Sequence, residues 1–498
     1  MRAGAIYVPL DPRNTVSRLA AMVEDCKPAV IICDDNTSGQ VQHLNTLDVP
    51  VLNISTISPK GDYAPNLALR HGPAFALYTS GSTGTPKGIL LSHSGLLNQI
   101  AGIQQVFSIG QERVLQQSSL GFDMSLEQIF ITLCNGGTVV VVSKEHRGDP
   151  AAIARIMREE SITYTEFVPS EYSVLLRYGS SDLRRCHSWK FAFSGGEEVT
   201  PRLKSAFAGL DLLHLRLLNV YGPTEVSVSC TRGEIACREA ETTVPSFGSV
   251  GYVMPNYSVY ILNEKLEHVP AAFPSQICVG GRGVGIGYLN NEALTQERFI
   301  KNKFTTADSD QHQSPLLYLT GDRGRLLDDG SLIFQGRMDG DSQMKLRGIR
   351  IEPDEISSVI LRTGASVIAD VAISARGDPV FLVAFIVFAP HSEPVDQQLY
   401  LKNLRASLPL PPYMLPNLMV PVDKIPMNVN GKRDKFAIAQ ITLLKLVKDK
   451  QTETLGGIAL QLKDVWIDVL SETGDLFEID YDSDFFSVGG SSLLLIKL

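Results

Sequence analysis

The sequence predicts an α/β protein with a large N-terminal domain, in which helices cover parallel sheets, followed by a smaller α+β unit. The first observation is a regular alternation of apolar strand-like and amphipathic helix-like segments between residues 93 and 221, which is typical of parallel sheets. The second is a change from Val259 onward to short strands and turns, which predicts a smaller β region. The third is a length of 498 residues with 44% hydrophobic residues, enough for about two to four domains with sizeable cores.

The individual elements follow from the spacing of the apolar residues. Residues 3–12 are expected to form a strand, 16–26 a helix and 29–33 another strand. Five helices should then alternate with five strands: helices 93–107, 125–134, 150–160, 170–178 and 200–209, and strands 113–117, 138–143, 162–167, 190–194 and 215–221. Because strands joined through helices pair in parallel, these five strands should form a parallel sheet.

A linker and a smaller unit follow the region of short strands. The stretch GRMDGD at 336–341 has the Gly and Asp density of a linker, which predicts a hinge. The α+β unit beyond it, ending near residue 440, is expected to contain helices 354–362 and 396–407, strands 366–374 and 380–388, and a turn at Gly377 and Asp378. A last amphipathic helix is expected at 458–470.

Charge and cysteine content narrow the function classes. A formal charge of −9 with interspersed signs offers no basic stripe, so a nucleic-acid partner is not expected. The seven cysteines form no CxxC pair, which argues against structural zinc and favours a reducing, cytoplasmic location. The longest apolar run, 380–389, is about half the length needed to span a bilayer, so no membrane segment is expected.

A loop of unusual composition, YTSGSTGTPKG, spans residues 78–88. Small hydroxyl residues alternate with glycines that let backbone N–H groups turn toward an anion, and Lys87 supplies a cation. The loop is therefore predicted to bind phosphate, and the alternative is a Gly/Ser/Thr-rich turn between two strands. Because Lys87 follows Gly81 by six residues and is preceded by Pro86, the loop does not match the GxxxxGK[ST] pattern of P-loop ATPases.

Three further stretches carry candidate binding groups. NVYGPTE at 219–225 follows an apolar strand, and open α/β sheets bind ligands at that edge, although GPT alone also predicts a simple turn. SGGEEVTP at 194–201 follows another strand, and its alternative interpretation is a turn capped by Thr200. Asp322 offers a carboxylate suited to a diol, and Lys432, in an Asn-Gly turn, presents an ammonium group on a loop tip.

In their order along the chain, these motifs resemble those of the adenylation domains of nonribosomal peptide synthetases, within the adenylate-forming (AMP-binding) enzyme superfamily. The resemblance covers nearly all of the sequence. FDMS at 122–125 and DFFSVGGSS at 484–492 favour this branch over the acyl-CoA ligases and luciferases, because the second string is similar to a carrier-protein attachment site. The resemblance implies an AMP-forming ligase that uses ATP and Mg²⁺ to convert an amino acid into an aminoacyl-adenylate and pyrophosphate.

The resemblance also implies roles for single residues in nucleotide binding. Tyr221 is expected to stack on adenine, Asn219 to face the adenine amino group, and Asp322 to hold the ribose hydroxyls, with Arg337 close behind it. The full set expected around ATP is Thr79, Ser80, Gly81, Ser82, Thr83, Gly84, Lys87, Gly195, Gly196, Asn219, Tyr221, Gly222, Thr224, Asp322 and Arg337.

Catalysis should depend on charge stabilisation, because carboxylate attack on the α-phosphorus gathers negative charge and needs no general base. The resemblance implies that Lys432 bridges the substrate carboxylate and the nucleotide, and that Glu225 helps to hold Mg²⁺. Thr83 and Lys87 complete the expected catalytic set.

For the amino acid, the resemblance implies a pocket formed by Asp123, Met124, Glu127, Glu166, Phe193, Gly195, Val220, Val228, Ser229 and Lys432. Asp123 is expected to pair with the α-ammonium group. Because a carboxylate facing an apolar pocket is costly unless paired, Glu127 and Glu166 favour a basic substrate such as ornithine, hydroxyornithine, lysine or arginine, and with it a siderophore-type product. The alternative is that either glutamate turns outward or pairs with Arg or Lys from a neighbouring strand.

These assignments divide the chain into an adenylation core at 1–338, without the first part of that domain, a C-terminal subdomain at 339–440, a linker at 441–455 and part of a peptidyl carrier domain at 456–498. Ser492 is expected to receive 4′-phosphopantetheine from a phosphopantetheinyl transferase, and the carrier is expected to act in cis or in trans. At the hinge, three residues separate Asp339 from Gln343, where the family has one. The alternative function is a truncated remnant that binds nucleotide or a partner without turnover.

Overall fold

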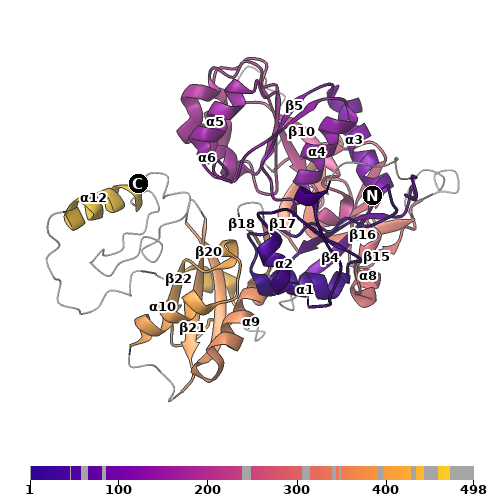
Figure 1. Cartoon of the computed structure of the whole chain (residues 1–498). Coiled ribbons are helices and arrows are strands. Elements are labelled where there is room, and N and C mark those ends of the chain that lie inside the picture. Colours follow the sequence, from indigo (N-terminus) through magenta and orange to yellow (C-terminus); the bar gives the residue numbers. More distant parts are fainter. Residues whose placement is uncertain are drawn as a thin grey trace.

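The computed structural model describes residues 2–44, 46–57, 65–80, 86–237, 248–305, 315–338, 344–346, 349–377, 380–390, 396–427, 433–441, 443 and 458–470. Outside these residues lie six predicted site positions, Gly81, Ser82, Thr83, Gly84, Lys432 and Ser492, as well as the hinge residues 339–343. Figure 1 shows a large body formed by the first two thirds of the chain and a smaller body of C-terminal elements beside it.

A seven-stranded sheet with the order β11-β10-β9-β8-β7-β5-β6 forms the centre of the large body. Its strands are β5 (Arg113–Gln116), β6 (Thr138–Val141), β7 (Tyr164–Phe167), β8 (Phe191–Gly195), β9 (Arg216–Tyr221), β10 (Thr231–Ile235) and β11 (Tyr252–Val253). The five strands from β5 to β9 pair in parallel, whereas β10 runs antiparallel to β9 and to β11. The predicted parallel sheet is therefore confirmed. The antiparallel strands β10 and β11 at its edge were not predicted from the sequence.

Helices cover both faces of this sheet (Figure 1). On one face lie α3 (His93–Phe107) and α4 (Met124–Cys134), and on the other lie α5 (Pro150–Glu159), α6 (Pro169–Leu183) and α7 (Pro201–Ala208). Because successive strand residues point to opposite faces, Tyr164 and Phe193 pack in the core on the α3/α4 side, whereas Phe167 and Ala192 pack in the core on the other side. The helix starts follow from capping: the Ser92 side chain accepts a hydrogen bond from Gly95 N at 3.0 Å, and Asp149 caps α5 in the same way.

Three smaller sheets complete the large body. A three-stranded sheet has the order β14-β4-β3, with β3 (Pro73–Thr79), β4 (Lys87–Ser92) and β14 (Gly287–Tyr288). A five-stranded sheet contains β12 (Tyr257–Leu262), β13 (Ser275–Gly281), β15 (Phe299–Lys301), β16 (Leu316–Leu326) and β17 (Leu332–Arg337). The third sheet pairs β1 (Ile31–Cys33) with β2 (Val51–Asn53). The helices α1 (Val16–Cys26) and α2 (Ser38–Leu44) belong to the same N-terminal region. Helix α8 (Glu292–Arg298) follows β14 and precedes β15 in the sequence.

The predicted strand at 3–12 is wrong. Only an isolated bridge between Tyr7 and Phe75 forms there. Pro9 and Pro12 lack the backbone N–H that a strand interior needs, and the chain turns at Asp11, whose carbonyl accepts a hydrogen bond from Asn14 N at 3.0 Å.

The smaller body has its own cores. Its three-stranded sheet has the order β20-β21-β22, with β20 (Ile368–Arg376), β21 (Phe381–Phe388) and β22 (Leu418–Pro421). Around it lie the hairpin β18 (Met344–Leu346) and β19 (Ile349–Ile351), and the helices α9 (Pro353–Gly364), α10 (Gln397–Ser407) and α11 (Lys435–Ala439). A separate helix, α12 (Ile458–Leu470), agrees with the helix expected there.

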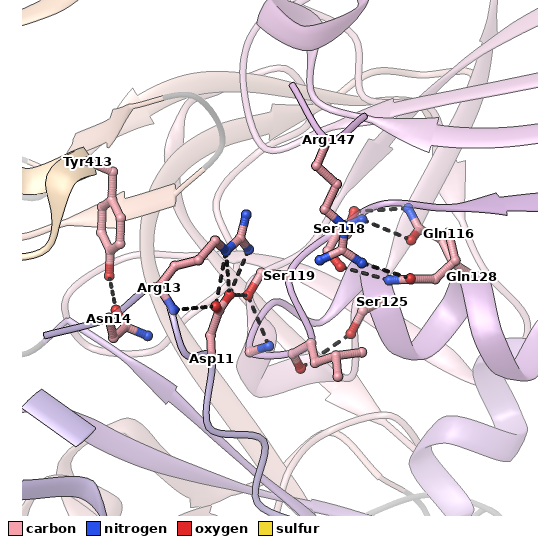
Figure 2. A network of polar contacts seen from close by, with 12 residues as sticks. Asp11, Arg13, Asn14, Gln116, Ser118, Ser119, Ser125, Gln128, Arg147 and Tyr413 are labelled. Atoms are coloured by element: carbon pink, nitrogen blue, oxygen red, sulfur yellow. Dashed lines mark hydrogen bonds and ion pairs between the residues drawn. The ribbon is translucent and has the colours of Figure 1, made fainter. Parts of the chain in front are cut away.

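Polar contacts between the two bodies include two side-chain hydrogen bonds among the described residues. Arg18 of α1 donates to Glu355 of α9 at 2.7 Å, and the Tyr413 hydroxyl donates to Asn14 at 3.4 Å (Figure 2). Within the described residues, no helix combines the length and apolar character that crossing a membrane would require.

Candidate functional site

A cavity of about 1940 Å³ opens where the parallel strands of the large sheet end and where the smaller body meets the larger one. Its walls contain residues from the ends of β8 and β9, from β16 and β17, and from the smaller body, including Tyr413. Many predicted site residues line it: Thr79, Ser80, Asp123, Met124, Gly195, Gly196, Asn219, Val220, Tyr221, Gly222, Thr224, Val228, Asp322 and Arg337. Six predicted residues that the structure describes do not line it: Lys87, Glu127, Glu166, Phe193, Glu225 and Ser229.

Asp322, Tyr221 and Arg337 form one polar group in the cavity wall. The Tyr221 hydroxyl donates to Asp322 Oδ2 at 2.7 Å, and Arg337 donates to Asp322 Oδ1 at 2.7 Å. Pairing of β16 with β17 places Asp322 opposite Arg337. Burial, reinforced by the negative charge of Asp322, raises the pKa of Tyr221 well above its usual value, so the phenol stays a neutral donor. Asp322 and Arg337, which lie 101 and 116 positions after Tyr221 in the sequence, are thus brought together with it in one cavity wall.

Asn219 and Gly195 shape the neighbouring part of the wall. The Asn219 amide donates to the Ser249 carbonyl at 2.8 Å, which fixes the side chain at the end of β9. A Cβ atom on Gly195 would lie 2.7 Å from the Val220 carbonyl oxygen. Strand β8 therefore approaches β9 too closely for any larger residue at this position, which explains the glycine without reference to a ligand.

Asp123 lies at the start of α4 with 5% of its surface exposed. Burial raises its pKa to about 6, while a hydrogen bond with Thr224 and the positive charge of Lys345 act in the opposite direction. Asp123 lines the cavity, and because burial outweighs these interactions, a positively charged ligand group would stabilise its ionised form.

Lys345, in the β18–β19 hairpin, lines the same cavity and was missed by the sequence reasoning. The signal available was its position in QMKLRGIRIE, directly after the predicted hinge. Only the docking of the smaller body brings this strand to Asp123, which lies 222 positions earlier.

The turn that follows η2 (Thr224–Val226) is strained. Ser227 and Val228 have φ angles of 62° and 77°, in the left-handed region that a β-branched residue such as Val228 rarely adopts. Val228 is 5% exposed and lines the cavity. Strained backbone of this kind is found at ligand-binding sites, where the surrounding fold enforces it.

The side chains at the two described ends of the predicted phosphate loop, Thr79 and Lys87, have different surroundings. Thr79 and Lys87 are paired across the β3–β4 ladder. The Thr79 hydroxyl is buried and has no hydrogen-bond partner in the part of the chain that the structure describes, and Thr79 lines the cavity. The Lys87 ammonium instead lies 5.3 Å from the centre of the Tyr288 ring. The β3–β4 pairing confirms the hairpin, whereas phosphate binding by this loop stays a prediction, because residues 81–85 lie outside the described residues.

Glu225 is fully buried beside the cavity and accepts a hydrogen bond from the Tyr288 hydroxyl at 2.8 Å. Among the described residues, no group of three or more His, Cys, Asp or Glu side chains could hold a metal ion. A complete protein-built metal cage is therefore not found in this part of the chain. Mg²⁺ does not need such a cage, because it is commonly held by one or two carboxylates together with substrate phosphates and water.

The interpretation of Glu127 as a free carboxylate facing the pocket is wrong. Arg232 donates to Glu127 Oε2 at 2.5 Å, and the Tyr164 hydroxyl donates to Oε1 at 2.6 Å. Both side chains of the Glu127–Arg232 ion pair are completely buried. The argument for a basic substrate therefore loses its main support. For Glu127 the alternative prediction, pairing with an Arg or Lys from a neighbouring strand, is confirmed.

A second polar network contributes residues to the cavity wall (Figure 2). Arg13 and Ser119 donate to the Asp11 carboxylate, with Arg13 Nη2 at 2.6 Å. Asp11, Arg13, Ser119 and Tyr413 all line the cavity. Sequence reasoning missed this group because Asp11 lies in a stretch predicted as strand, and because Ser119 is an isolated serine in sequence.

Three comparisons with known proteins relate the chain to characterised families. Residues 1–289 match the family model "AMP-binding enzyme". Over its whole length the chain is 41% identical to the hybrid PKS-NRPS synthetase traA of Penicillium crustosum, of which it covers 13%, and 41% identical to the hybrid PKS-NRPS synthetase thnA of Trichoderma harzianum, of which it covers 12%. The chain thus spans about an eighth of the length of these relatives.

Solved structures share the fold. Holo-PA1221, an NRPS protein containing adenylation and PCP domains, aligns with a TM-score of 0.79 at 23% identity, covering 100% of this chain and 78% of that chain. The Vibrio cholerae adenylation domain AlmE, solved with glycyl-adenosine-5′-phosphate, aligns with a TM-score of 0.72 at 24% identity, covering 88% of this chain and 84% of that chain. These alignments confirm the predicted fold class.

Proposed function

The chain belongs to the AMP-binding enzyme family, and on this basis we propose that it activates an amino acid with ATP and passes the aminoacyl group to a carrier thiol. One observation carries the proposal. Asp123 and Asp322, two carboxylates on different elements, line the same cavity at the ends of parallel strands. One suits an ammonium group and the other suits a diol, which are the two polar ends of an aminoacyl-adenylate.

The nucleotide would lie along the wall formed by β8, β9 and β16. Asp322 is held in position by Tyr221 and Arg337, so its carboxylate is oriented before the ribose hydroxyls arrive. Tyr221 and Asn219 would receive the adenine, and the backbone of Gly195 and Gly196 would border it. Thr79, whose buried hydroxyl has no partner among the described residues, would donate to a phosphate oxygen.

The amino acid would enter with its α-ammonium group on Asp123, which brings its carboxylate toward the phosphates. One carboxylate oxygen attacks the α-phosphorus, the bond from that phosphorus to the bridging oxygen of the β-phosphate breaks, and pyrophosphate leaves with the bonding electrons. No proton is transferred. Lys432, together with Thr83 and Lys87, would offset the charge that gathers in this step.

Glu225 is the carboxylate proposed to hold Mg²⁺ together with the phosphates, in agreement with the small number of protein ligands that this ion requires. When bound, Mg²⁺ offsets the negative charge of the phosphate oxygens. The contribution of Glu225 is position: its hydrogen bond to Tyr288 holds the carboxylate at the base of the turn that contains Thr224.

For the second step we propose that a phosphopantetheine thiol loses its proton to solvent and attacks the acyl carbon of the adenylate. The carbon–sulfur bond of a thioester forms, the bond from the acyl carbon to the phosphate oxygen breaks, and AMP leaves with the bonding electrons. The names of the relatives, hybrid PKS-NRPS synthetases, support this extension. The division at 1–338, 339–440, 441–455 and 456–498, the role of Ser492 as the phosphopantetheine attachment site, the phosphopantetheinyl transferase and the cytoplasmic location belong to the same proposal.

Amino-acid-dependent exchange of labelled pyrophosphate into ATP tests the first step. We expect exchange with at least one amino acid, and its loss when Asp123 is replaced by Ala. If no amino acid supports exchange while the protein is folded and binds ATP, the remnant interpretation replaces this proposal.

A further inference from the structure

The proposed reaction releases one proton. Adenylate formation transfers none, whereas the phosphopantetheine thiol must lose its proton to become the thiolate that attacks the acyl carbon. A cysteine-like thiol has a pKa of about 8.5, so only a small fraction is ionised at neutral pH. A side chain that accepts a proton near neutral pH would therefore accelerate the second step.

The cavity contains few side chains that suit this task. No histidine is found among the described residues that line it. Of the carboxylates in its wall, Asp322 is bound by Tyr221 and Arg337 at 2.7 Å each. Asp11 is bound by Arg13 at 2.6 Å. A carboxylate held by a guanidinium is a weak base, because the cation stabilises its charged form.

Three further carboxylates of the wall have other surroundings. Asp123 is the proposed partner of the α-ammonium group, so the bound amino acid occupies it. Glu197 and Glu198 directly follow the glycines that border the proposed nucleotide site, and Glu197 accepts a hydrogen bond from Ser170 N at 3.0 Å. Among the described residues of the wall, the remaining carboxylate is Glu171.

Glu171 belongs to the first turn of α6, shortly after the end of β7. The residue is exposed and lines the cavity. The amide of Gln117, which directly follows β5, donates to Glu171 Oε1 at 3.0 Å and so orients the carboxylate. Because a carboxylate has about four lone-pair positions, this bond leaves room for a further donor such as a thiol.

The electrostatic surroundings of Glu171 suit a proton acceptor. The walls of the cavity separate the group from bulk water, which raises its pKa to about 7, and the negative charge of Glu197 acts in the same direction. Hydrogen bonds from the Val168 backbone and from Gln117, and the positive charge of Arg13, act in the opposite direction. Near neutral pH the carboxylate is therefore ionised to a large extent, yet it binds a proton more strongly than an ordinary glutamate.

Glu171 lies on the wall between the smaller body and the proposed ammonium partner. On one side, Arg13 acts on Glu171, and Asn14, next in the chain, accepts a hydrogen bond from Tyr413 of the smaller body at 3.4 Å (Figure 2). On the other side, the segment 117–123 leads from Gln117 to Asp123 through a turn in which Phe122 N donates to the Ser119 carbonyl at 2.9 Å. A thiol that enters between the two bodies would thus pass Glu171 on its way to the adenylate.

We propose that Glu171 is a catalytic residue of the second step and that it receives the proton of the phosphopantetheine thiol. This inference rests on the proposed function. The S–H bond breaks and its proton moves to an oxygen of Glu171, while sulfur keeps the electron pair and forms a bond with the acyl carbon. The bond from the acyl carbon to the phosphate oxygen breaks, and AMP leaves with the bonding electrons. The protonated Glu171 then releases its proton to solvent.

The test measures both steps on the whole chain. Pyrophosphate exchange identifies an amino acid that is activated, and the adenylate formed from it is then mixed with pantetheine, whose thioester is measured in a single turnover. Glu171→Gln keeps the shape of the side chain and an oxygen that can accept from Gln117. We expect the thioester rate of this variant at neutral pH, divided by its exchange rate, to fall about hundredfold.

The pH profile separates catalysis from a structural role. Acceptance of a proton requires the ionised carboxylate, so the thioester rate of the parent should rise with pH through a midpoint of about 7. In Glu171→Gln the midpoint should move to about 8.5 or above, where the thiol ionises by itself, and the difference from the parent should shrink there to about tenfold or less. Glu198→Gln, a variant of another carboxylate in the wall, is the matched control and should keep the midpoint of the parent.

Three results would overturn the inference. The first is a Glu171→Gln variant with the rate ratio and midpoint of the parent, and the second is a shifted midpoint in Glu198→Gln alone. The third is exchange by the parent without any thioester, which would leave amino-acid activation intact. No exchange with any amino acid would overturn both this inference and the proposed function.

Discussion

Arg18 and Glu355 are 337 positions apart in the sequence, and their side chains form an ion pair of 2.7 Å between the large body and the smaller one. The Arg18 side chain is 10% exposed and that of Glu355 is 3% exposed. The pair lies beside the cavity, which Arg18 also lines. It is therefore the clearest polar connection through which docking of the smaller body is coupled to the site.

Replacing Arg18 with Met should weaken this docking. Arg18→Met removes a cationic partner from the buried carboxylate of Glu355, and breaking a buried ion pair typically costs about 3–5 kcal/mol. We expect a lower melting temperature and faster hydrogen exchange in α9. Arg113→Met is the matched control, because the Arg113–Glu160 pair is 37% and 50% exposed and its loss should cost at most about 1 kcal/mol. Equal behaviour of the two variants would show that Arg18 does not hold the bodies together.

Asp322→Ala should weaken ATP binding. The ribose hydroxyls would lose a charged acceptor worth roughly 1.5–3 kcal/mol, a change of about ten- to a hundredfold in Kd. Isothermal titration with ATP and Mg²⁺ measures the change. Asp328→Ala, on the exposed turn that follows β16, serves as the control and should leave the Kd unchanged. Unaltered affinity in Asp322→Ala would place the nucleotide elsewhere.

Asp123→Asn should stabilise the protein and inactivate it. The folded-state pKa of about 6 lies above the ordinary 3.8 because the group is buried. Ionisation of Asp123 therefore opposes folding. The free energy of unfolding of the parent should fall as the pH rises from about 4 to about 6, and the loss from this group should stay constant above that pH. At pH 7.5 the unfolding free energy of the variant should exceed that of the parent by up to roughly 3 kcal/mol, so the variant should melt at a higher temperature. At pH 4 the two proteins should melt at nearly the same temperature.

The same group predicts a pH profile for activity. Pairing with the α-ammonium group of the amino acid requires the ionised form of Asp123, so exchange activity of the parent should fall as pH drops below about 6. The amino acid KM should rise in that range, while the ATP Kd stays constant until other groups titrate. A flat amino acid KM from pH 7.5 to pH 5 would argue against Asp123 as the ammonium partner.

Lys432→Ala should spare ATP binding and slow adenylate formation by several orders of magnitude, because its charge matters most in the transition state. Single-turnover measurement of adenylate formation, beside ATP titration, separates the two effects. Lys424→Ala, on an exposed part of the same subdomain, is the control. Loss of binding and turnover to the same degree would contradict a transition-state role.

Local patterns determined most of the elements of this protein. The 3.6-residue spacing of apolar side chains predicted α1 at 16–26 and α3 at 93–107 with the bounds that the structure has, because such helices bury one continuous apolar face. The alternation of helices and strands predicted the parallel strands from β5 to β9, and the motifs placed Tyr221, Asp322 and Arg337 at one site. These predictions succeed because each depends on neighbours in sequence or on the connection rule for parallel strands.

Tertiary structure decided which charges are paired, and with them the nature of the pocket. From the sequence alone, Glu127 is interpreted as an unpaired carboxylate, because its partner Arg232 lies 105 positions away on β10. β10 returns antiparallel at the edge of the sheet, which helix and strand periodicity do not predict. Lys345 faces Asp123 only because the smaller body docks through Arg18 and Glu355. Burial and Coulomb interactions depend on distance in space, so a carboxylate's charge and accessibility follow from packing and not from its neighbours in the chain.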